Sequence, residues 1–174
     1  KTCFAAFSGD VAPAMLVFGA EVAIQSPSAE RRIPLADLYR NDGLDHLTLG
    51  ADEIVTGIYL PANLGGNASA YEKARVRGSI DFPLAGAAVR LAKAADGTLE
   101  DLCIALTGVN PHPQLVKGMD AYVGKKLGEA ELDEIRESTR KQAKPMHTTT
   151  VAPWYRRRVV GALARRLTAE LYAT

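Results

Sequence analysis

The chain has 174 residues, of which 47% are hydrophobic and 24% are charged, and its formal net charge is +1. This composition excludes a disordered chain, and no run of about 18 apolar residues predicts a transmembrane helix. The balanced charge argues against a general nucleic-acid-binding protein. Two cysteines form neither a disulfide framework nor a complete metal site, which fits the reducing cytoplasm. The first residue is Lys1 rather than Met, and we interpret the chain as part of a longer protein.

Residues 1–62 show the signals of a small antiparallel β unit. Pro13 and Gly19 bound a predicted short helix over 14–18. A turn at 26–29 and a helical turn at 35–39 separate three predicted strands, which cover 21–25, 31–34 and 53–60. Residues 62–69 are polar and contain two adjacent glycines. We interpret them as a linker between a domain of residues 1–62 and a domain of residues 68–174.

Alternating apolar residues predict a three-stranded antiparallel sheet in the second domain. Its strands cover 71–77, 84–93 and 99–107, and a turn at Asp96-Gly97 joins the last two. The middle segment also has helical propensity, but the turn favours a strand that pairs with its β-rich neighbour. Three helices are predicted to follow, over about 113–124, 129–141 and 154–172. The predicted fold class is therefore α+β, with C-terminal helices after the sheet.

Two short patterns are candidates for binding an anion. The alternating cations Lys73, Arg75 and Arg77 would share one face of a strand, where they could hold a phosphate or a reduced flavin. Edge strands also carry such cations to block aggregation, and the pattern alone favours that role. Ser8 and Asp10 precede a helix start, where free N–H groups can bind anions. Simple N-capping is the explanation that this second pattern favours.

The remaining candidates carry weaker signals. Cys103 lies among apolar residues and is predicted to be a buried apolar side chain. Cys3 is a better candidate for a metal ligand whose partners are missing, and the three histidines show no metal spacing. The arginines at 156–158 could bind RNA or an acidic partner, but a solvated helix face is the commoner explanation.

Four segments in order resemble the FAD-binding subunits of molybdenum hydroxylases, the xanthine dehydrogenase and carbon monoxide dehydrogenase superfamily. Residues 8–14, Ser-Gly-Asp-Val-Ala-Pro-Ala, resemble its S-x-D-x-x-P-A-L signature, and residues 71–85 resemble its Y-x-K-x-x-x-R-x-S-x-D-F-x-x-A block. Residues 52–61 match the strand between these blocks, and residues 105–109 resemble the A-L-x-G-V that follows. The order and spacing of the four segments agree with the family.

This resemblance implies that the chain is the C-terminal portion of a flavin subunit. Residues 1–62 would be the end of the second FAD-binding subdomain, and residues 68–174 would be the C-terminal α+β domain. The glycine-rich loop that cradles the FAD pyrophosphate would lie upstream. Molybdopterin and a 2Fe–2S cluster would belong to partner subunits, and an external carrier such as ferredoxin, NAD or a quinone would exchange electrons with the FAD.

Five residues are implied as flavin-binding. Lys73 matches the position that contacts the isoalloxazine ring, where a cation stabilises the reduced anion and raises the potential. Asp10 matches a flavin-contacting acid of the signature, and Ser8 lies beside it. Val55 matches a contact to the ring, and Tyr71 is expected to pack near the same site.

Within the family, residues 3–10 resemble the 4-hydroxybenzoyl-CoA reductase branch. That branch carries an additional 4Fe–4S cluster in an insertion just upstream, and Cys3 would match the last of its four cysteine ligands. The implied function is electron transfer between an external carrier and the iron–sulfur and molybdenum subunits, with no substrate chemistry on this chain. The alternative is a non-catalytic module that docks a partner through the basic face and the arginine-rich helix, without a flavin.

Overall fold

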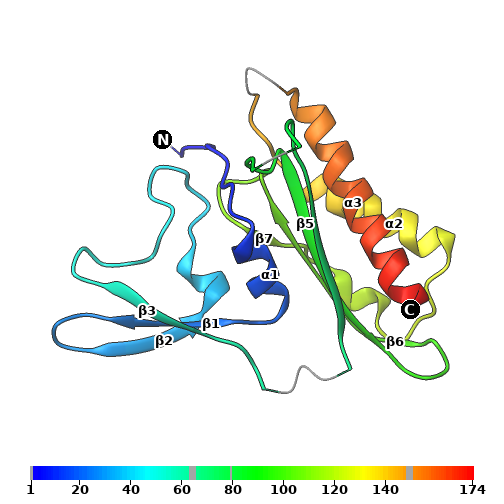
Figure 1. Ribbon diagram of the computed structural model, residues 1–174, viewed down its shortest axis with the longest axis horizontal. Helices are drawn as coiled ribbons and strands as arrows, with labels where there is room; N and C mark the ends of the chain where they lie inside the picture. The colour runs from blue at the N-terminus through cyan, green and yellow to red at the C-terminus, as the bar shows by residue number, and fades with distance from the viewer. Residues whose placement is uncertain (1, 63–65, 79, 148–150) are drawn as a thin grey trace.

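The computed structural model describes residues 2–62, 66–78, 80–147 and 151–174. They form two antiparallel sheets with the short helix α1 (Val11–Val17) between them, and two longer helices cover the outer face of the larger sheet (Figure 1). This architecture confirms the predicted α+β class. In the part of the chain that is described, no helix combines the length and the apolar character that crossing a membrane requires.

The smaller sheet has the strand order β2-β1-β3, and its strands are β1 (Glu21–Gln25), β2 (Glu30–Pro34) and β3 (Ile54–Tyr59). The 3-10 helix η1 (Leu35–Leu38) follows β2. The three predicted strands and the predicted helical turn agree with these bounds to within one residue. Helix α1 begins three residues earlier than predicted, because a proline is tolerated within the first turn of a helix.

The larger sheet has the strand order β4-β5-β6-β7, and its strands are β4 (Ala68–Ala74), β5 (Ala85–Lys93), β6 (Leu99–Thr107) and β7 (Gln114–Leu115). Strands β5 and β6 confirm the predicted hairpin, and the helical alternative for this segment is wrong. Gly97 adopts a φ of +86° in the turn between them, a conformation that favours glycine. Residues 63–65 of the predicted linker lie outside the described residues.

The predicted helix over 113–124 is wrong. Strand β7 pairs there with β6 as a fourth strand, and the helical part is the 3-10 helix η2 (Met119–Tyr122) alone. Gly118 and Gly124 flank η2 with φ values of +84° and +82°. Backbone pairing with β6 and the burial of apolar side chains from this segment outweigh its local helical signal.

Strand β4 lies three residues earlier than the predicted strand at 71–77. Its pairing with β5 ends at Ala74, whose carbonyl accepts a hydrogen bond from Leu84 N at 2.9 Å. Arg75 and Arg77 therefore lie in the connection to β5. The predicted strand face with three alternating cations does not form.

Alternation along β5 and β6 sends side chains into two cores. Helices α2 (Glu129–Gln142) and α3 (Pro153–Ala173), close to their predicted bounds, pack on one face of the sheet over the larger side chains Val89, Leu91, Ile104 and Leu106. The opposite face presents Ala88 and Ala105 to α1 and the smaller sheet. Cys103, predicted to be buried, is half-buried against this second core.

Candidate functional site

Asp10, Tyr71 and Lys73 meet at the start of α1. The Asp10 carboxylate accepts a hydrogen bond from Tyr71 Oη at 2.6 Å and forms an ion pair with Lys73 Nζ at 2.6 Å. Tyr71 and Lys73 stand two residues apart on β4, so their side chains leave the same face of the strand toward Asp10. The structure therefore brings together three of the five residues that the sequence predicts as flavin-binding.

This network determines the ionisation of Asp10 and Tyr71. Burial raises the pKa of Asp10, but the hydrogen bonds from Lys73 and Tyr71 and the nearby positive charges outweigh burial, and the pKa lies below its ordinary value. Burial, and then the Asp10 acceptor, raise the pKa of the Tyr71 hydroxyl well above its ordinary value. At neutral pH the site therefore holds a carboxylate and a neutral phenol beside the lysine.

Asp10 occupies the N-cap position of α1 without capping the helix. In the described part of the chain, its side chain makes no hydrogen bond to the first turn of α1. Both carboxylate oxygens instead accept hydrogen bonds from β4. Simple N-capping, which the local pattern favours, is therefore not the role of this residue.

Lys73 is also attached to the connection that follows β4. Its Nζ donates a hydrogen bond to Asp81 O at 2.9 Å. The Asp81 carboxylate accepts hydrogen bonds from Arg77 N at 3.1 Å and Arg77 Nη2 at 3.3 Å, and these hold the pKa of Asp81 below its ordinary value. The charge of Lys73 is thus compensated by one carboxylate and held in place by one backbone carbonyl.

Two residues that shape this site were not expected from the sequence. Gly86 lies opposite Lys73 on β5. A Cβ atom on Gly86 would stand 2.8 Å from Thr107 Cγ2 and 3.0 Å from Tyr71 Oη. The buried Thr107 hydroxyl donates to Gly9 O at 2.8 Å, which fastens the segment before α1 to the end of β6. A glycine inside a predicted strand is the signal that could have identified Gly86, because it marks a close approach.

A mostly apolar hollow of about 350 Å³ opens beside Asp10, between α1, η1 and β3. It is lined by Phe7, Gly9, Asp10, Val11, Ala12, Met15, Leu35, Tyr39 and Ile58. The rings of Phe7 and Tyr39 pack edge to face, with their centroids 5.6 Å apart. Apolar walls with one carboxylate suit a planar, largely apolar group that carries polar atoms along one edge.

Asp10 is the one predicted flavin residue among the described residues that line this hollow. The two β4 residues that bind Asp10 do not line it, and neither do the other predicted residues. Ser8 is half-buried and does not line it. Val55 is 40% exposed on β3, and that strand contributes Ile58 to the lining instead. Cys3 is a free, half-buried thiol whose Sγ accepts a hydrogen bond from Ala5 N at 3.5 Å. Among the described residues, no three His, Cys, Asp or Glu side chains gather as a metal site.

Arg156 differs from the solvated helix face that the arginine run predicts. It is buried, and its Nη1 donates a hydrogen bond to Gly108 O at 3.1 Å. Gly108 has a φ of +76°, and its N–H donates to Phe7 O at 2.8 Å. Arg156 therefore supports the turn that holds Phe7 at the hollow, whereas Arg157 and Arg158 are exposed.

Two protein families match the chain. The CO dehydrogenase flavoprotein C-terminal domain matches residues 69–171, which is more than half of the chain. The chain belongs to this family. The FAD-binding domain in molybdopterin dehydrogenase matches residues 2–63. Together these matches confirm the predicted membership of the CO dehydrogenase flavoprotein family, whose members are FAD-binding subunits of molybdenum hydroxylases.

Relatives of the family extend beyond this chain. The glyceraldehyde dehydrogenase medium chain of Sulfolobus acidocaldarius is 27% identical over 165 residues, covering 94% of this chain and 57% of that protein. A CO dehydrogenase structure from Oligotropha carboxidovorans has a TM-score of 0.85 at 25% identity, covering 94% of this chain and 56% of its own. Quinoline 2-oxidoreductase from Pseudomonas putida 86 shares the fold, with a TM-score of 0.80 at 20% identity, over 95% and 56%. The chain thus spans little more than half the length of these relatives.

Proposed function

We propose that this chain is part of the FAD-binding subunit of a molybdenum-containing hydroxylase or reductase complex, in which it relays electrons. One observation carries the proposal: the wall of the apolar hollow contains Asp10, and Asp10 binds both Tyr71 and Lys73. These three residues come from the two sequence blocks that resemble flavin-contacting motifs. The match of residues 2–63 to an FAD-binding domain supports the same assignment.

The residues of the chain would set the surroundings of the cofactor. When bound, FAD supplies the capacity to take up and release electrons in one- or two-electron steps. With a group bound, the apolar walls of the hollow would exclude water from it, which would strengthen the effect of nearby charges. Lys73 presents a positive charge fixed by Asp81 O, and Asp10 compensates part of it. The balance between these two charges would tune how strongly negative charge on the flavin is stabilised.

The proposed partners are a molybdopterin-binding subunit and a 2Fe–2S subunit of the same complex. An external carrier, such as ferredoxin, NAD or a quinone, would exchange electrons with the flavin. The relatives named CO dehydrogenase and glyceraldehyde dehydrogenase support a redox complex of this kind. Substrate chemistry would take place on the molybdenum-bearing partner and not on this chain.

The finer proposal is the 4-hydroxybenzoyl-CoA reductase branch, with a 4Fe–4S cluster upstream. It is supported by the resemblance of residues 3–10 and by Cys3, a free thiol that is only half-buried. Cys3 would supply one of the four thiolates that such a cluster needs. Three further cysteines in a short insertion upstream of Lys1, with cluster iron in the purified protein, are expected. Absence of those cysteines would remove both the cluster and the branch.

Absorbance of the purified full-length protein tests the flavin assignment. A bound flavin absorbs at about 450 nm. Ala12→Glu places a carboxylate in the lining of the hollow and is expected to remove most of the flavin, whereas Ala95→Glu in an exposed turn should retain it. A colourless full-length complex would contradict the proposal and favour the interaction module instead.

A further inference from the structure

A second hollow, separate from the flavin residues, lies where the loop after β6 meets the end of α2. Its volume is about 550 Å³, which falls within the range of about 300–1,000 Å³ that is typical of small-molecule sites. Its polar lining includes Asn110, His112, Lys117, Lys141, Gln142 and Lys144. None of the described residues that line it is an aspartate or a glutamate. The hollow is therefore strongly basic in a chain whose net charge is only +1.

Two buried polar atoms in this wall lack a partner. Asn110 is 4% exposed, and its Oδ1 accepts a hydrogen bond from Lys144 N at 2.9 Å. Its Nδ2, and likewise Nδ1 of His112, are buried without a hydrogen-bond partner among the described residues. Buried polar atoms of native proteins are almost always paired, so these two point to a ligand in the hollow.

The walls that carry the lysines are cross-linked by hydrogen bonds. The Gln142 side chain accepts a hydrogen bond from Lys117 N at 2.9 Å and donates one to Lys117 O at 3.0 Å. Asn110 O accepts a hydrogen bond from Phe7 N at 2.9 Å, which attaches the N-terminal segment to the same loop. The backbone beneath the lysines is therefore fixed before any ligand binds, which lowers the entropic cost of binding.

The described residues provide no salt-bridge partner for the lysines of this hollow. Among the ion pairs that the structure describes, none includes Lys117, Lys141 or Lys144. Three positive charges around one concave surface attract anions and raise their local concentration. An anionic ligand would therefore suit both the positive charge and the two unpartnered atoms.

We propose that this hollow binds a small polyanion of the phosphate-ester or polyphosphate class. A phosphate group presents several oxygens in different directions, so it can accept hydrogen bonds from the lysines and from the buried Asn110 Nδ2 at once. A planar carboxylate has only two oxygens and would leave part of this donor set unused. Burial lowers the pKa of His112, and an anion bound beside its ring would raise that pKa again.

Titration of the full-length chain with pyrophosphate, followed by calorimetry, tests the proposal. Ionic strength is held constant because salt screens these charges. Saturable binding is expected, and Lys144→Gln should weaken it about ten-fold, since a charge-assisted hydrogen bond is lost. Asn110→Asp replaces the buried donor with a negative charge and should abolish binding. Lys126→Gln, at an exposed lysine outside the hollow, should leave it unchanged.

Further measurements distinguish the alternatives. The pKa of His112, followed by NMR, should rise when pyrophosphate is added. AMP separates two sources of the phosphate: tighter binding than inorganic phosphate indicates a nucleotide, and equal binding indicates the phosphate alone. Flavin absorbance should stay unchanged in the Lys144→Gln and Asn110→Asp variants. If Asn110→Asp does not fold, the weaker binding expected for Lys144→Gln still tests the proposal. No binding by the wild type, equal weakening by Lys126→Gln, or loss of binding in the assembled complex would each overturn the proposal.

Discussion

At the scale of single residues, charge compensation dominates the proposed flavin site. Lys73 contacts one carboxylate, that of Asp10, and one backbone carbonyl, that of Asp81. The Lys73 side chain is 19% exposed, so water screens its charge less than it screens a surface lysine. Removal of either charged partner should therefore change the electrostatic potential at the hollow.

Opposite shifts of the flavin potential are expected from Lys73→Met and Asp10→Asn. Losing the cation destabilises the reduced anion and lowers the potential, whereas losing the carboxylate raises it. One partly buried charge is expected to contribute about 1.4 kcal/mol, or about 30 mV for a two-electron couple. A redox titration of the full-length complex measures both variants, with Lys126→Met as a control that should not shift. Shifts of the same sign would contradict the charge balance.

Gly86→Ala is expected to destabilise the protein by about 1–3 kcal/mol, the usual cost of overpacking. The added Cβ would meet Thr107 Cγ2 at 2.8 Å and would push Tyr71 Oη away from Asp10. Urea unfolding of the full-length chain measures the loss. Gly78→Ala is the matched control, because among the described residues no atom apart from its chain neighbours lies within 4 Å of its added Cβ. Equal stability of the two variants would show that the site tolerates a side chain at Gly86.

The sequence marks the three residues of this network as candidates, but it does not predict that they contact one another. Tyr71 and Lys73 alternate in one block, and Asp10 stands before a helix start in another. An aspartate at that place is a typical N-cap, so nothing local directs its carboxylate toward a strand 63 residues away. The role of Gly86 depends on the register of β4 and β5, which only the folded sheet defines.

At the scale of elements, the periodicity of the sequence predicted the long strands. It did not predict the strand bounds that depend on pairing with a neighbouring strand. Strands β5 and β6 have nine residues each, and the turn between them favoured a strand at β5 over the helix that its residues also allow. Strand β7 has two residues and forms by pairing with the edge of β6. The arginines after Ala74 continue the alternating sequence pattern of β4. They lie outside the sheet because the pairing of β4 with β5 ends at Ala74.

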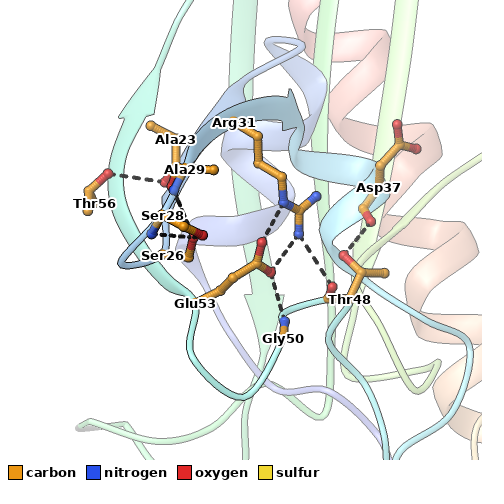
Figure 2. Close-up of polar contacts among 10 residues, drawn as sticks. All are labelled: Ala23, Ser26, Ser28, Ala29, Arg31, Asp37, Thr48, Gly50, Glu53 and Thr56. Carbon is orange, nitrogen blue, oxygen red and sulfur yellow. Dashed lines mark hydrogen bonds and ion pairs between the residues drawn. The ribbon is translucent and has the colours of Figure 1, made fainter.

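The loop before β3 is fastened to β2 by Arg31 and Glu53 (Figure 2). The guanidinium donates from Nε to Glu53 Oε1 and from Nη2 to Glu53 Oε2, each at 2.8 Å. Gly50 N adds a third hydrogen bond to Oε2 at 2.7 Å. Such a two-pronged pair is directional, and here it connects two elements that are far apart in sequence.

This contact predicts a pH dependence of stability. The hydrogen bonds from Arg31 and Gly50 lower the pKa of Glu53 from 4.5 to about 2. Because the depressed pKa belongs to the folded state, the stabilisation is present above pH 4.5 and is lost as the pH falls toward 2. Glu53→Gln should therefore flatten the pH dependence of the free energy of unfolding in that range, measured by urea unfolding. Glu100→Gln, at an exposed residue, should leave the wild-type slope, and an unchanged slope in Glu53→Gln would contradict the assignment.

At the scale of the whole molecule, the larger sheet contributes side chains to two hydrophobic cores. Helices α2 and α3 cover its outer face, and α1 and the smaller sheet lie on its inner side (Figure 1). The outer face packs large side chains, whereas the inner face presents alanines. The small residues allow α1 to approach the sheet closely, and this approach brings Asp10 within reach of β4. The position of the proposed flavin site therefore depends on a core that contains none of its charged groups.

Ala105→Leu tests this dependence, because Ala105 is fully buried on the inner face of β6. The larger side chain should force α1 away from the sheet and cost about 1–3 kcal/mol. Because Asp10 begins α1, the flavin content of the full-length protein should fall together with the stability. Ala92→Leu, at a half-buried position near the end of β5, should change stability by less than about 0.5 kcal/mol and keep the flavin. Urea unfolding and absorbance measure both quantities, and a destabilised Ala105→Leu protein with full flavin content would show that the site does not depend on the close approach of α1.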